Sequence, residues 1–253
     1  MDSSKYDYGE NFGEIHGILL YKEFIEYWSD VEAFQARPDD LVIAAYPKSG
    51  VKQLKEMKSP RMIKTHLPPQ LLPASFWEKR CKMIYICRNA KDVAVSYYYF
   101  FLMVTIHPDP GSFPEFVDKF MQGQVPYGSW YDHVKSWWEK NEDPRVLFMF
   151  YEDMKEDIRK EVMKLMQFLG RKSSEELVDK IIKHTSFQEM KNNPSTNYTM
   201  MPEEIMNQKV SPFMRKGISG DWKNYFTLAL NERFDIHYEQ QMKGCTLKLK
   251  TEI

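Results

Sequence analysis

The sequence is poor in cysteine, carries almost no net charge and contains no apolar run long enough to cross a bilayer. Its three cysteines, Cys81, Cys87 and Cys245, are an odd number without the spacing of a metal site, so we expect a reducing compartment. The net charge of -1 gives no electrostatic basis for wrapping nucleic acid or binding anionic lipid. The first residues also lack the basic flank and apolar run of a secretory signal. We therefore expect a soluble, cytoplasmic protein that binds neither nucleic acid nor membrane.

Short apolar runs alternate with segments of helical periodicity along the 253 residues, without an internal repeat or a low-complexity linker. This alternation predicts a single α/β domain over residues 1–253, with a central parallel sheet flanked by helices. The expected strands are Leu41–Tyr46, Arg61–His66, Lys82–Cys87 and Val146–Tyr151. The expected helices are Lys91–Met103, Pro114–Met121, Trp130–Lys140, Lys155–Leu169, Ser174–His184 and Thr227–Met242. The segment Lys191–Gly220 is rich in Asn, Pro, Ser and Gly, and we expect it to form a long functional loop.

Polar residues follow the first two expected strands. The run Tyr46–Gly50 (YPKSG) places a lysine and small residues at a strand end, where ligands bind in doubly wound sheets. It departs from the standard P-loop pattern, and taken alone it favours an ordinary turn. The second strand ends at Lys64, Thr65 and His66, before a Leu-Pro-Pro turn. A histidine there can act as a base near neutral pH, or it can be a structural residue at the strand end.

Further candidate anion ligands lie after the third strand and in the long loop. Arg88 at the strand end and Ser96 on the next helix can converge on one phosphate, because arginine offers a planar fork of donors and serine a hydroxyl. An Arg-Asn pair at a turn is also typical of a surface cap. Tyr151 can pack on a nucleobase or cover the core. The run Arg215–Gly217 is either an anion clamp or a solvated charge pair, and its spacing does not choose between them.

The chain resembles the cytosolic sulfotransferases, and most closely those that act on estrogens, in five segments that follow one another in register: YPKSG, KTHLP, YICRNAKDVAVSYY, FYEDMKEDIRKEV and FMRKGISGDWKN. The resemblance implies a P-loop-like sulfotransferase fold. It also implies transfer of a sulfonate group from 3′-phosphoadenosine 5′-phosphosulfate (PAPS) to the phenolic hydroxyl of estrogens and similar phenols, without a metal. Such an in-line displacement at sulfur depends mainly on positioning and on charge stabilisation.

The resemblance also implies roles for individual residues. His66 would be the general base, Lys48 would neutralise charge that develops on the bridging oxygen, and Lys64 would support the same region. Arg88, Ser96 and the run 215–217 would hold the 3′-phosphate of the donor. The full set of donor-binding residues would be Lys48, Ser49, Gly50, Arg88, Ser96, Tyr151, Thr185, Ser186, Phe187, Met190, Arg215, Lys216 and Gly217.

An apolar acceptor site and a dimer contact are implied in the same way. The family pattern places Tyr21, Phe24, Pro47, Lys64, His66, Tyr97, Phe100, Val104, Tyr127, Tyr198, Ile205 and Met206 around the acceptor. Aromatic and methionine side chains suit a rigid steroid, although a chain with 15% aromatic residues must bury most of them in its core anyway. Lys223, Thr227, Leu228 and Glu232 resemble the family's dimer motif, with leucine where valine is usual, so we expect a homodimer.

The chain departs from the family directly after YPKSG, because a block several secondary-structure elements long is absent between Gly50 and Val51. That block would carry part of the donor site, so the alternative hypothesis is a catalytically impaired form that binds steroid or nucleotide, or dimerises, without turnover. The joined segment Val51–Lys58 has the spacing of a helix about 12 Å long. A nucleoside-type kinase is a third possibility, but the sequence shows no recognisable magnesium-binding carboxylate after the loop.

Overall fold

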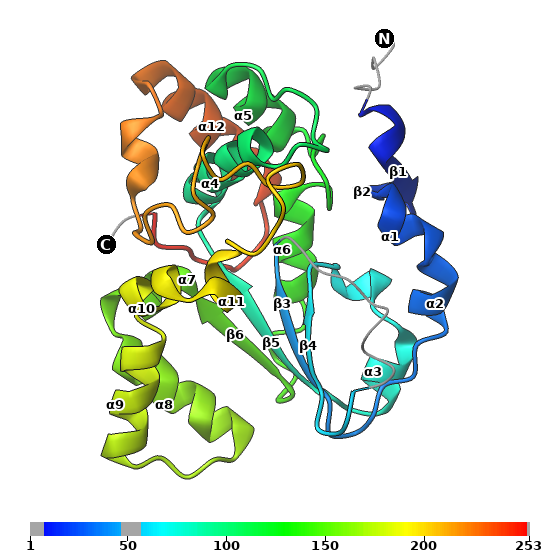
Figure 1. Ribbon diagram of the computed structural model, residues 1–253, viewed down its shortest axis with the longest axis vertical. Helices are drawn as coiled ribbons and strands as arrows, with labels where there is room; N and C mark the ends of the chain where they lie inside the picture. Colours follow the sequence, from blue (N-terminus) through cyan, green and yellow to red (C-terminus); the bar gives the residue numbers. More distant parts are fainter. Residues whose placement is uncertain (1–7, 47–56, 252–253) are drawn as a thin grey trace. The chain divides into compact units, whose positions relative to one another are not determined.

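The computed structural model describes residues 8–46 and 57–251 and contains a four-stranded sheet (Figure 1). Its strands are β3 (Leu41–Ala45), β4 (Met62–Thr65), β5 (Lys82–Cys87) and β6 (Val146–Phe150), in the order β4-β3-β5-β6. Strand β3 pairs in parallel with β4 on one side and with β5 on the other. All four expected strands are present to within one residue at each end, and the predicted α/β class with a central parallel sheet is confirmed.

The burial of the strands explains why they were visible in the sequence. The central strand β5 is an almost continuous apolar run in which Met83, Ile84 and Tyr85 are all buried, as expected for a strand covered on both faces. The sequence left open whether the strands on either side of the junction after Gly50 are neighbours. They are, because Leu41 of β3 lies opposite Met62 of β4 in the parallel register.

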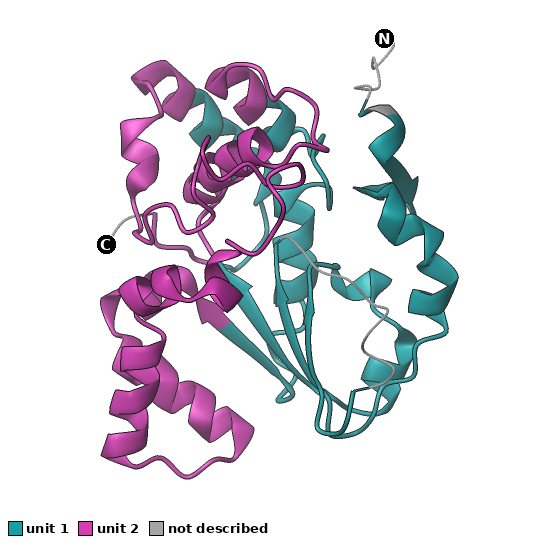
Figure 2. Cartoon of the chain, in the orientation of Figure 1, with its two compact units in different colours: residues 1–87, 118–148, 233–247 teal, residues 88–117, 149–232, 248–253 magenta. Residues whose placement is uncertain are grey.

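Two compact units divide the chain, and each is built from several separate stretches (Figure 2). Unit 1 comprises Met1–Cys87, Asp118–Phe148 and Arg233–Leu247, and it contains the sheet up to Phe148 of β6. Unit 2 comprises Arg88–Val117, Met149–Glu232 and Lys248–Ile253.

Besides its sheet, unit 1 contains a hairpin and short helices. These are η1 (Gly9–Asn11), β1 (Phe12–Ile15), β2 (Ile18–Tyr21), α1 (Lys22–Glu26), α2 (Trp28–Glu32), η2 (Pro69–Leu71), α3 (Ala74–Glu78) and α6 (Trp130–Trp138). The hairpin was not predicted. Its two-residue turn consists of His16 and Gly17, both with positive φ (51° and 76°), which is the conformation that suits a tight turn between twisted strands.

Unit 2 is mainly helical. It contains α4 (Ala90–Met103), α7 (Tyr151–Glu156), α8 (Ile158–Leu169), α9 (Glu175–His184), α10 (Phe187–Asn192), α11 (Pro194–Asn197) and η3 (Asp221–Asn224). Two more helices, α5 (Phe113–Met121) and α12 (Leu228–Gln241), have residues in both units. The predicted start of α9 is confirmed, because the Ser174 hydroxyl accepts a hydrogen bond from the Leu177 N–H.

Two sequence predictions in unit 2 were wrong. The expected helix Lys155–Leu169 is two helices, because the chain leaves helical geometry at Asp157 (φ -144°), whose carboxylate then caps α8 by accepting a hydrogen bond from the Lys160 N–H. The expected loop Lys191–Gly220 begins inside α10 and contains α11, which starts with a proline after an asparagine cap.

The expected helix Val51–Lys58 lies almost wholly outside the described residues, and its last two positions, Met57 and Lys58, are not helical. No helix in residues 8–46 and 57–251 is long and apolar enough to cross a membrane.

Candidate active site

The predicted site residues fall into two half-sites, one in each unit. Unit 1 contains the predicted catalytic residues His66 and Lys64 with part of the predicted acceptor set, and unit 2 contains the predicted nucleotide-binding residues with the rest of the predicted acceptor set. Four predicted residues, Pro47, Lys48, Ser49 and Gly50, lie outside the described residues.

His66 is held by the neighbouring strand in one defined orientation. The register pairs Ala44 of β3 with Thr65 of β4, so the next position along both strands places Ala45 beside His66. The His66 Nδ1 atom bonds to the Ala45 carbonyl oxygen. A carbonyl oxygen can only accept, so Nδ1 donates, and in the neutral form of the ring Nε2 carries the lone pair. His66 is buried, and its geometry is that of a base that acts through Nε2.

Aromatic side chains surround this histidine. The Tyr127 ring meets the His66 ring edge-on with centroids 5.5 Å apart, and Tyr21 meets Tyr127 in the same way at 6.0 Å. Burial raises the pKa of Tyr21 well above its usual value, so its hydroxyl stays protonated. Phe24, also predicted at the acceptor, packs edge-on against Trp28 at 6.0 Å.

Lys64 lies two residues before His66 on β4 and is exposed. Although the side chain as a whole is exposed, neighbouring protein atoms partly desolvate its amine, and this desolvation lowers the pKa of Lys64. A lysine with a lowered pKa is easier to deprotonate than one in water.

In unit 2, Arg88 is fixed by three contacts at the start of α4. Its guanidinium lies over the Tyr151 ring, 4.3 Å from the centroid, and its Nη2 donates to the Ile218 carbonyl oxygen at 2.8 Å. The same nitrogen is 3.6 Å from the buried Asp92 carboxylate. The structure thus brings Arg88 and Tyr151 together with the loop that follows Gly217.

The Arg215–Lys216 pair is built around a buried carboxylate. Arg215 donates to Asp221 at 2.5 Å and Lys216 donates to the other oxygen of the same group at 2.6 Å. Burial by itself would raise the pKa of Asp221, but the hydrogen bonds from Lys216, Asn224 and Arg215 hold it below its ordinary value. The cations are therefore neither simply solvated nor randomly placed, because one shared counter-ion fixes both.

Gly217 is required by a close approach as well as by its backbone. Its φ is +66°, and a Cβ at this position would lie 2.1 Å from Cδ2 of Phe187 at the start of α10. The structure thus brings Gly217 and Phe187, both predicted at the nucleotide, into direct contact.

Most of the other predicted nucleotide residues lie at or near the start of α10, and Ser96 lies on α4. Ser186 caps α10 by accepting from the Glu189 N–H, Thr185 ends α9, and the Met190 carbonyl accepts from the Thr196 hydroxyl. Ser96 is exposed on α4, and no hydrogen bond of its side chain to the other described residues is observed.

The unit 2 part of the acceptor set forms an apolar cluster. Val104, at the end of α4, and Met206 are both buried and pair with each other in an isolated antiparallel β-bridge. Phe100 and Tyr198 pack against them. Tyr97 is buried and stacks on Phe100 with centroids 6.1 Å apart. Ile205 is 43% exposed and does not belong to the buried cluster.

Sequence reasoning missed the buried polar residues that support these groups. Asp92 accepts from the Gly220 and Trp222 N–H groups, and so fastens the loop beyond Gly217 to α4. Asn89 caps α4 and donates to buried Glu152 at 2.7 Å. The available signal was the presence of acidic residues in the motifs RNAKD, FYEDM and SGDWKN. A carboxylate that is buried nearly always has a partner, so these residues could have been expected to bind neighbouring groups.

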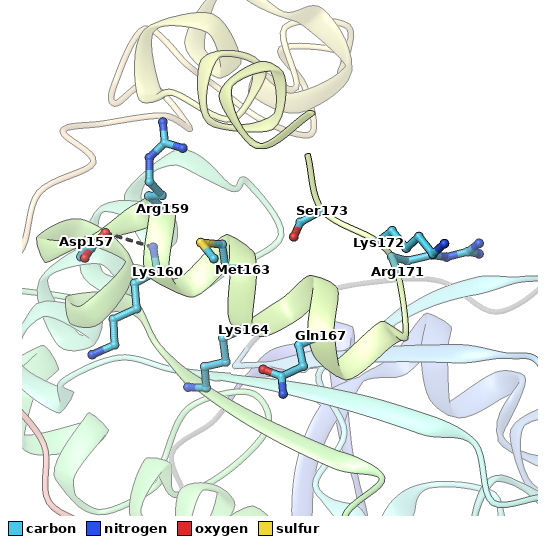
Figure 3. A pocket seen from close by; sticks show the side chains of 9 residues that line it. All are labelled: Asp157, Arg159, Lys160, Met163, Lys164, Gln167, Arg171, Lys172 and Ser173. Carbon is cyan, nitrogen blue, oxygen red and sulfur yellow. Dashed lines mark hydrogen bonds between the residues drawn. The ribbon is translucent and has the colours of Figure 1, made fainter. Parts of the chain in front are cut away.

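A cavity of about 710 Å³ lies on α8 and the turn after it, apart from every predicted site residue (Figure 3). Its cations point in different directions, with Arg159 directed away from Lys164 and with Arg171 and Lys172 turned outward. Arg159 is also paired with Glu175 and with Asp179. Because the charges do not converge, we do not assign an anion site to this cavity. No group of residues with the composition of a metal site occurs in the described ranges.

Comparison with known proteins decides the family. The model of the sulfotransferase domain matches residues 9–246. The chain is a member of the sulfotransferase family. Among curated sulfotransferases, it is 74% identical to Sulfotransferase 1E1 of Cavia porcellus, with 100% of both chains covered. It is 68% identical to Sulfotransferase 1E1 of Homo sapiens, with 99% of this chain and 100% of the relative covered.

One solved sulfotransferase structure supports the same assignment, and a second solved structure shows the same fold. The crystal structure of mouse sulfotransferase SULT7A1 complexed with PAP superposes with a TM-score of 0.82 at 32% identity, over 93% of this chain and 95% of that one. Retinol dehydratase in a complex with retinol and PAP shares the fold, with a TM-score of 0.80 at 23% identity over 92% of this chain and 90% of that one.

The length of the sequence alignment bears on the absent block. The match to the Cavia porcellus sulfotransferase runs over 295 residues, whereas this chain has 253, a difference of 42 positions. This sulfotransferase chain therefore lacks a counterpart to at least that many aligned positions.

Proposed function

We propose that this sulfotransferase transfers a sulfonate group from PAPS to the phenolic hydroxyl of estrogens and similar phenols. The observation that carries the proposal is the contact of His66 Nδ1 with the Ala45 carbonyl oxygen, which requires a proton on Nδ1 and so places the lone pair of the neutral ring on Nε2. A phenol is a weak nucleophile until its proton is removed, so a buried base with one defined basic nitrogen suits this acceptor. Similarity to Sulfotransferase 1E1 of several mammals supports the choice of estrogens.

The donor, when bound, supplies the sulfonate group and a 3′-phosphate. We propose that Arg88, Ser96 and the run 215–217 hold that phosphate. The cations fit this role because Arg88 is stacked on Tyr151 and Arg215 is fixed by Asp221, so both guanidinium groups are ordered before an anion arrives.

The same proposal assigns the other donor residues. Lys48, Ser49 and Gly50 bind the donor's sulfonate end, and Lys64 supports the reacting region together with Lys48. Thr185, Ser186, Phe187 and Met190 line the adenosine side. Within unit 2, the contact of Gly217 with Phe187 supports this assignment, because it joins the phosphate-binding run to the proposed nucleoside-binding segment.

For the acceptor, we propose that the aromatic residues beside His66 and the apolar cluster of unit 2 contact the steroid. Tyr21 and Tyr127 form an edge-on aromatic chain that ends at the His66 ring. Phe100, Val104, Tyr198 and Met206 already pack together. Flat apolar surfaces with few polar groups are what a rigid ring system requires.

The alternative is a sulfotransferase chain that binds nucleotide or steroid without turnover, because it lacks at least 42 aligned positions. The deciding experiment measures transfer of labelled sulfonate from PAPS to estradiol by the 253-residue chain, with Lys48→Ala and His66→Ala as variants. We expect turnover by the parent chain and its loss in both variants, while His66→Ala retains affinity for 3′-phosphoadenosine 5′-phosphate. A folded parent chain that binds this nucleotide but never transfers sulfonate would establish the alternative.

We further propose that the protein is a single domain, resides in the cytoplasm and forms a homodimer through Lys223, Thr227, Leu228 and Glu232. Leu228, an apolar side chain at the start of α12, is 76% exposed and is therefore accessible for such a contact. The Thr227 hydroxyl caps α12 by accepting from the Leu230 N–H, which fixes the exposed leucine on the first turn of the helix.

A further inference from the structure

Helix α6 in unit 1 presents two side-chain donors to consecutive backbone carbonyls at the end of β4. Nε2 of His133 lies 2.9 Å from the His66 carbonyl oxygen, and Nε1 of Trp137 lies 3.3 Å from the Leu67 carbonyl oxygen. Residues four apart lie on one face of a helix. One face of α6 therefore forms hydrogen bonds with the backbone of His66, the proposed base, and with that of Leu67.

The hydrogen bonds from α6 matter because the segment that follows β4 has few backbone donors of its own. The two residues after Leu67 are prolines, which have no N–H, so the chain cannot continue a ladder of backbone hydrogen bonds beyond β4. The Leu67 N–H is occupied locally, by the Thr65 hydroxyl at 3.2 Å. The carbonyls of His66 and Leu67 must therefore find their partners elsewhere, and α6 supplies them.

The protonation of His133 is defined by its two neighbours. Its Nε2 faces a carbonyl oxygen and must donate, so in the neutral ring Nδ1 accepts from the Tyr85 hydroxyl at 2.9 Å. Burial lowers the pKa of His133 to about 4, which keeps the ring neutral near pH 7. Burial also raises the pKa of Tyr85 well above its usual value, so the phenol retains the proton that it donates.

We propose that His133 is a positioning residue, which holds the backbone of His66 so that the His66 side chain meets Ala45 through Nδ1 and presents Nε2 as the base. The direction of the bonds is Tyr85 O–H to His133 Nδ1, and His133 Nε2–H to the His66 carbonyl. The Tyr46 ring, edge-on to His133 at 5.4 Å, fixes the imidazole from the side of β3. The catalytic consequence rests on the proposed function, but the orientation of His66 does not.

The substitutions separate positioning from structural support. His133→Phe removes the donor to His66, whereas His133→Gln offers an amide donor and an amide oxygen for Tyr85. Tyr85→Phe is the matched control, since it deletes a buried hydrogen bond from the same network but leaves the His133 donor to His66 in place. If His133 only supports the fold, His133→Phe and Tyr85→Phe should behave alike.

The first readout does not require turnover. Nitrogen NMR shifts of the His66 ring should show the Nδ1–H tautomer in the parent chain and in Tyr85→Phe, and a mixture of tautomers in His133→Phe. If the His66 ring keeps one tautomer in a folded His133→Phe variant, the proposal is overturned even when the chain proves inactive.

The second readout is steady-state kinetics. A displacement of the base by about 1 Å is expected to lower kcat by roughly 100-fold in His133→Phe, with little change in KM for either substrate. His133→Gln should recover part of that loss, and Tyr85→Phe should stay close to the parent chain. Equal losses of kcat in His133→Phe and Tyr85→Phe would overturn the positioning role, whereas inactivity of the parent chain alone would count only against the proposed function.

Discussion

Acid should weaken the protein through His133, and the structure gives the size of the effect. Burial lowers the pKa of this histidine from 6.5 to about 4. Between these values the unfolded chain binds a proton that the folded chain excludes, so stability is complete above pH 6.5 and falls as the pH drops. The separation of the two pKa values corresponds to about 3 kcal/mol, because a tenfold change in a binding constant is about 1.4 kcal/mol.

Most of this loss falls in an accessible range. About 2 kcal/mol should disappear between pH 7 and pH 5 from this single group. Equilibrium unfolding in urea, followed by circular dichroism at pH 7, 6 and 5, measures the free energy of unfolding in the parent chain and in His133→Gln. The glutamine does not titrate, so its variant should lose about 2 kcal/mol less over the interval.

The comparison removes contributions from other groups, such as Asp221, whose lowered pKa also makes the folded state sensitive to acid. Tyr85→Phe keeps the imidazole and should retain the pH dependence of the parent chain. If His133→Gln and the parent chain lose the same free energy between pH 7 and pH 5, the reasoning that His133 is buried in its neutral form is wrong.

Three further predictions concern unit 2. Arg88→Ala should weaken binding of 3′-phosphoadenosine 5′-phosphate about 10- to 100-fold in titration calorimetry, since a hydrogen bond to a charged group contributes roughly 1.5–3 kcal/mol, and unchanged affinity would remove Arg88 from the phosphate site. Gly217→Ala should lower the midpoint of unfolding in urea more than Gly170→Ala does. Both residues have positive φ, but only at Gly217 would the new Cβ meet another side chain, that of Phe187, and equal losses would count against the close contact. Leu228→Glu should convert the proposed dimer to a monomer in sedimentation velocity, and a dimer that survives would place the interface elsewhere.

The sheet was predictable because the buried positions of its strands leave a direct trace in the sequence. Strands β3 and β5 appear as compact apolar runs, and their observed ends lie within one residue of the predicted ones. The hairpin of β1 and β2 left a weaker trace, because most of its residues are only partly buried and its strands have four residues each. The boundary between α7 and α8 depends on one backbone conformation at Asp157, which helical periodicity does not report.

The sequence proposed the residues of the candidate site, but it did not report the interactions that these residues make. The strand ends and the family motifs located His66, Arg88 and Arg215. The tautomer of His66 depends on a carbonyl 21 residues away on another strand. The pairing of Arg215 depends on the depth at which Asp221 is buried. Neither the tautomer of His66 nor the burial of Asp221 can be read from spacing along the chain.

The interleaving of the two units constrains how the protein can be made. The chain changes unit after residues 87, 117, 148, 232 and 247, so neither unit corresponds to one continuous fragment. During synthesis on the ribosome, α6 emerges about a hundred residues before its partners on α12, because Tyr131 contacts His237 and Lys135 donates to the Gln241 carbonyl. The contacts between α6 and α12 therefore form only when nearly the whole chain has been made. Truncation from the C-terminus should destabilise α6 before it destabilises the sheet.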